Sequence, residues 1–173
     1  MTPDAPPRTP LAHLPTPAVA ADRLGAVLGL PAGALWIKHD DLTGVAGGGN
    51  KIRKLEHLAT AALAAGADTL VTGGGRQSNH VRLTAAVANR LGLGATVVLA
   101  SAAPERPTGN VVLDEVLAPD IVWAGDLDYY ALEDAIAAES ERLVGEGRRP
   151  YLIPVGGASA VGTLGYVHAA DEL

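Results

Sequence analysis

Short apolar runs alternate along the chain with segments of helical periodicity, and this alternation constrains the fold more than any other feature. Four runs have the length and composition of buried strands, at residues 69–72, 95–100, 120–123 and 151–155. Between one run and the next, apolar residues recur at helical spacing. Strands that alternate with helices pair in parallel through right-handed crossovers. We therefore expect an α/β protein with an open, twisted, mainly parallel sheet flanked by helices.

Each helical segment has one apolar face. In the segment that begins at residue 51, Leu55, Leu58, Ala62 and Leu63 fall on one face. The other helices are expected at residues 18–28, 78–91, 111–117, 130–144 and 159–173, and a further short strand at 35–38. The last of these helices reaches Leu173 without a Gly, Asn or Pro stop signal. We therefore expect the N-terminal portion of a longer protein, the alternative being a complete small domain with a frayed end.

The composition fits a globular protein and excludes several classes of function. Apolar residues make up 48% of the chain and aromatic residues only 3%, so the core is expected to consist of Ala, Val and Leu. A net charge of −6 argues against a nucleic-acid-binding surface. The absence of Cys excludes disulfides and thiolate metal sites, which suits a cytoplasmic protein. The five histidines show no paired metal spacing, so no metal site is expected.

The N-terminal stretch MTPDAPPRTPLAHLPTP starts with an acid and is broken by prolines. A signal peptide would instead begin with basic residues and continue into an apolar run, so we expect an extended arm. No segment of the sequence has the unbroken apolar length of a membrane span. The arm is followed by Asp40 and Asp41, which we interpret as turn-formers and not as an acid/base pair.

Three glycine-rich turns are candidates for a ligand site: GGGNK at 47–51, TGGGRQSNH at 72–80 and VGGAS at 155–159. Ligands of open α/β sheets gather where strands end and helices begin, and free N–H groups at helix N-termini bind anions. Two nucleotide motifs fail here. A Walker loop would need Ser or Thr after Lys51, where Ile52 stands, and a dinucleotide fingerprint would need Gly at Ser78. A nucleotide-binding module is therefore a distant alternative.

Three cations, Lys51, Arg53 and Lys54, cluster at the expected start of a helix, where positive charge is unfavourable. Lys51 and Lys54 are three residues apart and share a helical face. An anion such as a phosphate would offset their repulsion; the alternative is a solvated pair of surface lysines. Lysine can also form a Schiff base with an aldehyde. Pyridoxal 5'-phosphate combines the aldehyde and the phosphate in one molecule.

Three blocks of the sequence carry a resemblance to a known family. They are KHDDLTGVAGGGNKIRKLEHL at 38–58, QSNHVR at 77–82 and IPVGGASAVGTLGY at 153–166. In this order they resemble the D-cysteine desulfhydrase / 1-aminocyclopropane-1-carboxylate deaminase family. Its members are pyridoxal-phosphate enzymes of the tryptophan-synthase-β-like fold (fold type II). The resemblance runs from about residue 14 to the end of the chain.

The resemblance implies roles for individual residues. Lys51 would be the Schiff-base lysine, Lys54 would help to hold the cofactor phosphate, and Asn79 would bind the ring hydroxyl of the cofactor and contact the substrate. Ser78 would be catalytic and would touch the substrate at its reacting carbon or carboxylate.

The turn around Ser78 also supplies residues for the substrate. Gln77 and His80 would complete the substrate site, with Ser78 and Asn79 between them. From the residues alone, Ser78 is also a natural N-cap, and a lone His80 is more often a packed residue than a ligand.

The resemblance also implies a domain division and an activity. Residues 1–50 would form the arm and the start of the larger cofactor domain, 51–155 a smaller α/β domain, and 156–173 the return towards the larger domain. KHDDLTG and His80 favour D-cysteine as substrate, with 1-aminocyclopropane-1-carboxylate as the alternative.

A non-catalytic cofactor-binding remnant is the alternative from another class. The family implies a homodimer. It also continues beyond the length of this chain, so the 173 residues alone are expected to be inactive or weakly active.

Overall fold

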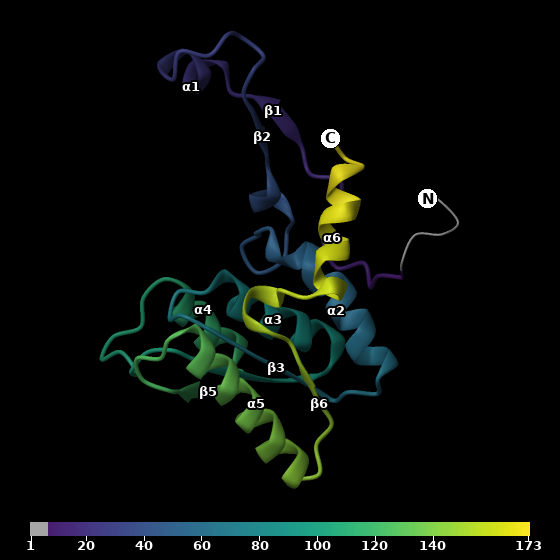
Figure 1. Ribbon diagram of the computed structural model, residues 1–173, viewed down its shortest axis with the longest axis vertical. Helices are drawn as coiled ribbons and strands as arrows, with labels where there is room; N and C mark the ends of the chain where they lie inside the picture. Colours follow the sequence, from purple (N-terminus) through teal and green to yellow (C-terminus); the bar gives the residue numbers. More distant parts are fainter. Residues whose placement is uncertain (1–6) are drawn as a thin grey trace.

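The structure is a computed structural model that describes residues 7–173, and its larger sheet has four parallel strands, in the lower part of the view in Figure 1. Its strands are β3 (Thr69–Gly74), β4 (Gly94–Leu99), β5 (Asp120–Trp123) and β6 (Pro150–Leu152). Their order across the sheet is β5-β4-β3-β6. The predicted α/β class and parallel sheet are confirmed. The last strand is shorter than predicted, because Val155–Gly157 forms a single 3-10 turn.

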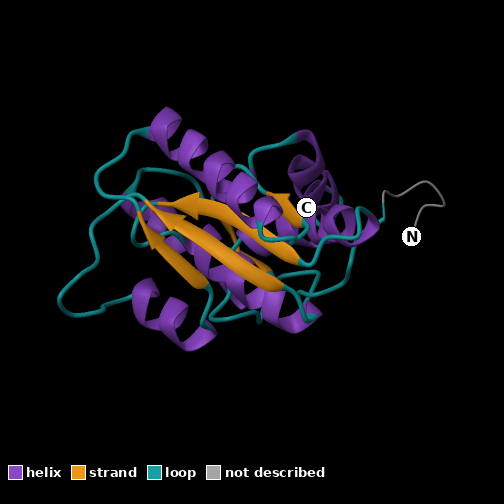
Figure 2. Ribbon diagram, turned by 90° about the horizontal axis from the view of Figure 1, so that it is seen from below, coloured by secondary structure: helices purple, strands orange, loops and turns teal. Residues whose placement is uncertain are grey.

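Helices cover both faces of this sheet (Figure 2). The helices that follow residue 50 are α2 (Lys51–Ala64), α3 (Asn79–Leu91), α4 (Asn110–Leu117), α5 (Tyr129–Gly145) and α6 (Ala160–Ala170). Successive strand residues point to opposite faces. Val71 accordingly packs with Ile136 of α5, whereas Leu70 packs with Leu83 of α3 and the residues of α2. The sheet is therefore buried on both sides, as a parallel sheet must be.

The chain reverses direction across the sheet at β3. The connections run from β3 to β4 to β5, and the next strand, β6, returns to pair on the free side of β3. Such a switch point opens a crevice outside the carboxyl ends of the strands. The glycine turn that follows β3 and the one that follows β6 both lie at this end of the sheet.

A separate two-stranded arm projects from the sheet domain (Figure 1). It consists of β1 (Ala18–Ala20) and β2 (Trp36–Lys38), which pair antiparallel, with α1 (Asp22–Val27) between them. The helix predicted at 18–28 is therefore wrong in its first three residues, which form β1. Periodicity within one segment cannot reveal a pairing partner almost twenty residues away. Residues 1–6, the first part of the expected N-terminal arm, lie outside the described residues.

Helix α2 contacts both the segment around residues 9–12 and the last helix, α6. Its Glu56 is 1% exposed and accepts hydrogen bonds from the backbone N–H groups of Leu11 and Ala12. Helix α6 packs along the same helix (Figure 1). Three of the four apolar residues predicted on one face of α2 are buried, but Leu63 is 43% exposed. Leu63 lies one residue beyond the buried Ala62, about 100° further round the helix.

Within residues 7–173, no helix has both the length and the hydropathy needed to cross a membrane.

Candidate active site

The turns that were singled out in the sequence meet beside the first turn of α2. Lys54 Nζ donates a hydrogen bond to the carbonyl of Gly156, 3.1 Å away, in the turn after β6. A Cβ placed on Gly157 would lie 3.4 Å from Lys54 Cδ and 3.3 Å from the His80 ring of α3. Residues from α2, α3 and the 155–157 turn are therefore in contact at one point.

Lys51 and Lys54 form a pair of cations at this point. Lys51 is the first residue of α2 and Lys54 lies one turn further, and both side chains are partly buried. The pKa of Lys54 is lowered from its ordinary value, first by burial and then by the charge of Lys51. Its ammonium group also lies 5.9 Å from the centre of the Tyr166 ring. Two partly buried like charges of this kind favour an anionic ligand.

The third cation, Arg53, belongs to the fold and not to this pair. Its side chain is 1% exposed and donates two hydrogen bonds each to Asp40 (2.8 and 2.7 Å) and Glu172 (2.8 and 2.9 Å). The Asp40 hydrogen bond is the largest cause of the raised pKa of Arg53. Asp40 is therefore an ion-pair partner in a 3-10 turn, Asp40–Leu42, and its interpretation as a turn-former is consistent with this position.

The glycine loop before Lys51 is fixed by a residue that the sequence analysis did not single out. Arg82 of α3 is 8% exposed, and its Nη2 donates to the Gly48 carbonyl at 2.8 Å. Gly48 has a φ of 76°, and a Cβ there would lie 1.8 Å from the carbonyl oxygen of Asp41. Only glycine fits this position. Arg82 lies inside the block QSNHVR, but nothing in the local pattern indicates its long-range partner.

Ser78 and Asn79 lie at the N-terminus of α3. Ser78 is the N-cap, with its Oγ accepting from the Val81 backbone N–H at 3.3 Å, so the predicted capping role is confirmed. Asn79 Oδ1 accepts a hydrogen bond of 2.9 Å from Asn110 Nδ2 of α4. Gln77 is joined to the same loop: its amide contacts Thr108 and Asn110. The catalytic and binding roles expected for these residues stay predictions.

His80 is enclosed in the interior, with 2% of its surface exposed. Thr72 donates its single hydroxyl proton to the Ile153 carbonyl at 2.8 Å, so His80 Nε2 is the donor in the 3.1 Å contact with Thr72 Oγ1. Burial, and then the charges of Lys51 and Lys54, lower the pKa of His80 to about 3. The ring is therefore neutral, and its Nδ1 has no partner among residues 7–173.

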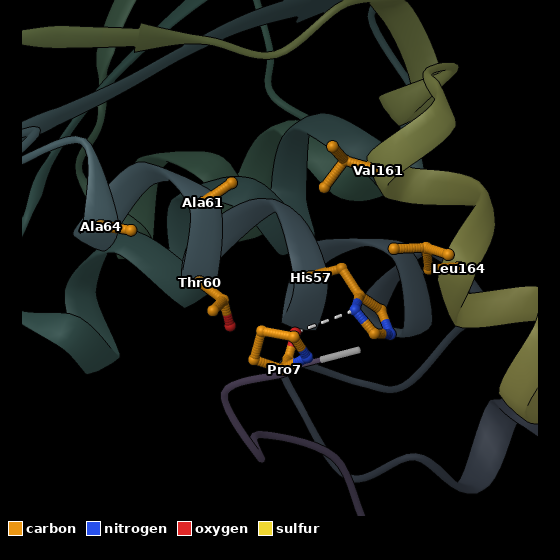
Figure 3. A pocket seen from close by; sticks show the side chains of 7 residues that line it. All are labelled: Pro7, His57, Thr60, Ala61, Ala64, Val161 and Leu164. Carbon is orange, nitrogen blue, oxygen red and sulfur yellow. Dashed lines mark hydrogen bonds between the residues drawn. The ribbon is translucent and has the colours of Figure 1, made fainter. Parts of the chain in front are cut away.

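A pocket on another part of α2 contains none of the predicted site residues. Figure 3 shows it between α2 and α6. Its volume is about 200 Å³. Its lining residues are Pro7, His57, Thr60, Ala61, Ala64, Val161 and Leu164. His57 Nδ1 lies 3.2 Å from the Pro7 carbonyl, the hydrogen bond that is dashed in Figure 3. Apart from His57 and Thr60 the lining is apolar, and neither lysine of the pair contributes to it.

The donor set at the lysine pair fits pyridoxal phosphate. Lys51 supplies a primary amine at the start of a helix, where backbone N–H groups are free to bind an anion. Lys54 supplies a second positive charge beside it. Asn79 has an amide NH₂ group that is not used by its contact with Asn110. The aldehyde of the cofactor would react with the Lys51 amine, its phosphate would bind near Lys54 and the helix N-terminus, and its ring oxygen would accept a hydrogen bond from Asn79.

Comparison with known proteins identifies the family. The family model of pyridoxal-phosphate dependent enzymes matches residues 9–173, so the chain belongs to this family. Its cofactor is pyridoxal 5'-phosphate, as the resemblance implied. The D-cysteine desulfhydrase of Klebsiella pneumoniae is 44% identical over 173 residues, covering 96% of this chain and 51% of the relative. The bifunctional D-cysteine desulfhydrase/1-aminocyclopropane-1-carboxylate deaminase of Arabidopsis thaliana is 42% identical over 171 residues, covering 94% of this chain and 42% of that protein.

Solved structures confirm the tryptophan-synthase-β-like fold (fold type II). The crystal structure of an ACC deaminase homologue matches with a TM-score of 0.88 and 42% identity, covering 96% of this chain and 50% of its own. A threonine deaminase matches with a TM-score of 0.66 and 24% identity, and the match covers 94% of this chain and 46% of the threonine deaminase chain. This match shows the shared fold alone. The chain spans about half the length of the curated relatives it matches.

Proposed function

We propose that the protein is a pyridoxal-phosphate-dependent lyase that acts on a small amino acid, with D-cysteine as the substrate. The observation that carries this proposal is the pairing of Lys51 with Lys54 beside the Gly156–Gly157 turn. The Klebsiella relative, 44% identical, is named a D-cysteine desulfhydrase. The reaction would be a β-elimination of sulfide, after which water would hydrolyse the released aminoacrylate to pyruvate and ammonia.

Individual residues have different roles in this proposed reaction. Pyridoxal phosphate, when bound, supplies an aldehyde for a lysine amine and a ring that draws electrons from the substrate carbon. Lys51 would be the amine that holds the aldehyde, and its Nζ would move a proton at the substrate carbon. Lys54 and the N-terminus of α2 bind the phosphate. Ser78 orients the substrate at the start of α3, where free backbone N–H groups receive its carboxylate.

Gln77 and His80 support the substrate turn from two sides in this proposal. Gln77 holds the turn against residues 108–110 through its side-chain amide. His80 fixes it from the interior through Thr72. Because His80 is neutral, it adds no third charge to the lysine pair. The substrate contacts of both residues would then come mainly from the backbone.

The second candidate is opening of the ring of 1-aminocyclopropane-1-carboxylate and its hydrolysis by water to 2-oxobutanoate and ammonia. It is favoured by the Arabidopsis relative, whose name carries both activities. Assays of sulfide release from D-cysteine and of 2-oxobutanoate formation from the cyclopropane substrate distinguish the two. L-Cysteine serves as the stereochemical control.

The assignment of Lys51 is tested by adding pyridoxal phosphate to the protein and recording the near-visible absorbance spectrum. Borohydride reduction followed by peptide mass spectrometry then shows which of the three lysines carries the cofactor, Lys38, Lys51 or Lys54. The proposal expects a band and a reduced adduct on Lys51, and neither in Lys51→Ala. An adduct on Lys38 or Lys54 in the unchanged protein would overturn it. Since the 173 residues alone are expected to be inactive or weakly active, a band without product from either substrate would support a non-catalytic cofactor-binding protein only in a protein of the relatives' full length.

Three further features belong to the same proposal. We propose a homodimer in the cytoplasm, which light scattering and cell fractionation test. We also propose the division into residues 1–50, 51–155 and 156–173, with the middle segment as the smaller domain. The sheet and α2 to α5 lie inside 51–155, which is compatible with this division. No nucleic-acid or membrane partner is proposed.

A further inference from the structure

We infer that Asn110, the first residue of α4, is a positioning residue that fixes the side-chain amide of Asn79. In the fixed orientation Asn79 offers its ligand a hydrogen-bond donor and not an acceptor. The inference rests on the proposed function for the identity of the ligand. The geometry of the two asparagines stands without it.

The orientation of both amides follows from a backbone group. Asn110 Nδ2 lies 2.9 Å from the backbone carbonyl of Gln77. A carbonyl can only accept, so the Asn110 atom at this position must be the nitrogen. Its second hydrogen is directed to Asn79 Oδ1, also 2.9 Å away. The Asn79 atom that faces Asn110 must then be the oxygen, which leaves the Asn79 NH₂ group for a ligand.

Asn110 is itself held in place by Gln77. The backbone N–H of Asn110 donates to Gln77 Oε1 at 2.8 Å, and Gln77 Nε2 donates to the Thr108 carbonyl at 2.9 Å. Gly109 has a φ of 59°, and a Cβ there would lie 2.4 Å from Gln77 Oε1. Glycine is therefore required between Thr108 and Asn110. The four hydrogen bonds give residues 108–110 a defined position against the start of α3.

The ligand group that suits Asn79 is an oxygen that carries negative charge. An amide NH₂ donates and cannot accept, so it stabilises an anionic oxygen and disfavours its protonated form. In pyridoxal phosphate this is the ring oxygen. If Asn79 turned its amide round, its own oxygen would face that group, and two acceptors would repel. Asn110 therefore controls the protonation state of the ligand without touching it.

Two variants separate this role from a general loss of structure. Asn110→Ala removes the restraint and lets the Asn79 amide rotate. Asn110→Asp replaces the NH₂ donor by a carboxylate, which attracts the Asn79 NH₂ group and so reverses the Asn79 amide. The matched control is Asn89→Asp. Asn89 of α3 donates from Nδ2 to the Leu117 carbonyl at 2.7 Å, so it restrains the other end of α4 without contact to Asn79.

The first measurement is a pH titration of the near-visible absorbance of the protein with pyridoxal phosphate. Loss of a donor to an anionic oxygen raises the pH at which it loses its proton. Asn110→Asp is expected to move the midpoint upward and to weaken cofactor binding about tenfold, the effect of one hydrogen bond to a charged group. Asn89→Asp should leave both unchanged. The inference would be overturned if both variants changed the midpoint and the affinity equally, or if Asn110→Asp changed neither.

A second measurement needs no cofactor. In ¹H–¹⁵N spectra of the cofactor-free protein, the Asn110 NH₂ hydrogens should exchange slowly with solvent, because both have acceptors. The Asn79 NH₂ hydrogens should exchange fast, and their resonances should shift in Asn110→Asp. Slow exchange at Asn79 and fast exchange at Asn110 in the unchanged protein would overturn the inference. If no cofactor band forms, the proposed function fails, while this measurement still decides the positions of the two amides.

Discussion

Arg53 and Glu172 lie 119 residues apart in the sequence and are joined by two hydrogen bonds of 2.8 and 2.9 Å. The same guanidinium binds Asp40 and the Thr16 hydroxyl, so four separate segments meet at one buried side chain. Arg53 lies between Lys51 and Lys54 in sequence but on another side of α2. The network therefore fixes the first turn of α2, on which both candidate cofactor-binding lysines depend.

Replacement of Arg53 by Met is expected to destabilise the protein by about 3–5 kcal/mol, because Asp40 and Glu172, two partly buried carboxylates, lose the buried cation that they share. Urea unfolding followed by circular dichroism measures the effect. Arg142→Met is the control: Arg142 pairs with Glu139 and Glu146 on the surface of α5, so its loss should be small. Equal losses in the two variants would show that the buried network is not a principal source of stability.

Glu172 is expected to make the free energy of unfolding depend on pH under acidic conditions. Burial raises its pKa, but hydrogen bonds from Arg53 and Lys38 outweigh that effect and bring the pKa down to about 2, from 4.5. A carboxylate with a lowered folded-state pKa stabilises the fold fully above its unfolded value and loses this contribution as the pH falls. The stability advantage over Glu172→Gln should therefore shrink between about pH 5 and pH 2. A constant difference across that range would contradict the assignment.

Asp114 should behave in the opposite way. It is fully buried on α4, neither of its oxygens has a hydrogen-bond partner within residues 7–173, and burial, opposed by the charge of Arg82, raises its pKa to about 6. The folded state then holds a proton that the unfolded state loses at lower pH. The stability contributed by this proton is present below about pH 4 and is lost as the pH rises to about 6.

Asp114→Asn cannot titrate and gives the reference curve. The stability of the unchanged protein relative to Asp114→Asn should fall between about pH 4 and pH 7 and then level off. Chemical unfolding at a series of pH values measures both proteins under the same conditions. A relative stability that rises with pH in this range would mean that the Arg82 charge, and not burial, dominates at Asp114.

Much of the fold could be predicted because strand and helix periods are local. The four strands of the sheet, their parallel pairing and the starts of α2 and α3 follow from apolar spacing and glycine turns, whereas the order of the strands across the sheet was not predicted. The pairing of β1 with β2 could not be predicted, because three-residue strands carry almost no period and depend on their partner. The shortened end of β6 likewise reflects the turn at Gly156, where φ is 65°.

The site was predictable where a residue breaks a local rule, and not where its role depends on a distant partner. Lys51 and Lys54 stand out because cations are unfavourable at a helix N-terminus. Arg53 stands beside them with the same signal, but its partner at position 172 gives it a different role. Arg82 and Asn110 carry no local signal at all, since each acts on a loop more than thirty residues away.

Lys54 is expected to recognise the phosphate and not the ring of the cofactor. Replacing it by Met keeps the stem of the side chain but removes the charge that lies beside the 155–157 turn. Affinity for pyridoxal phosphate should then fall about tenfold or more, the range for a charge-assisted contact, while affinity for pyridoxal stays the same. Lys38→Met removes a cation that pairs with Glu172 instead, so its ratio of the two affinities should not change. Fluorescence or absorbance titrations with both compounds give the ratios. If Lys54→Met weakened pyridoxal as much as pyridoxal phosphate, Lys54 would act on the ring or on the fold, and the phosphate would have to be bound elsewhere.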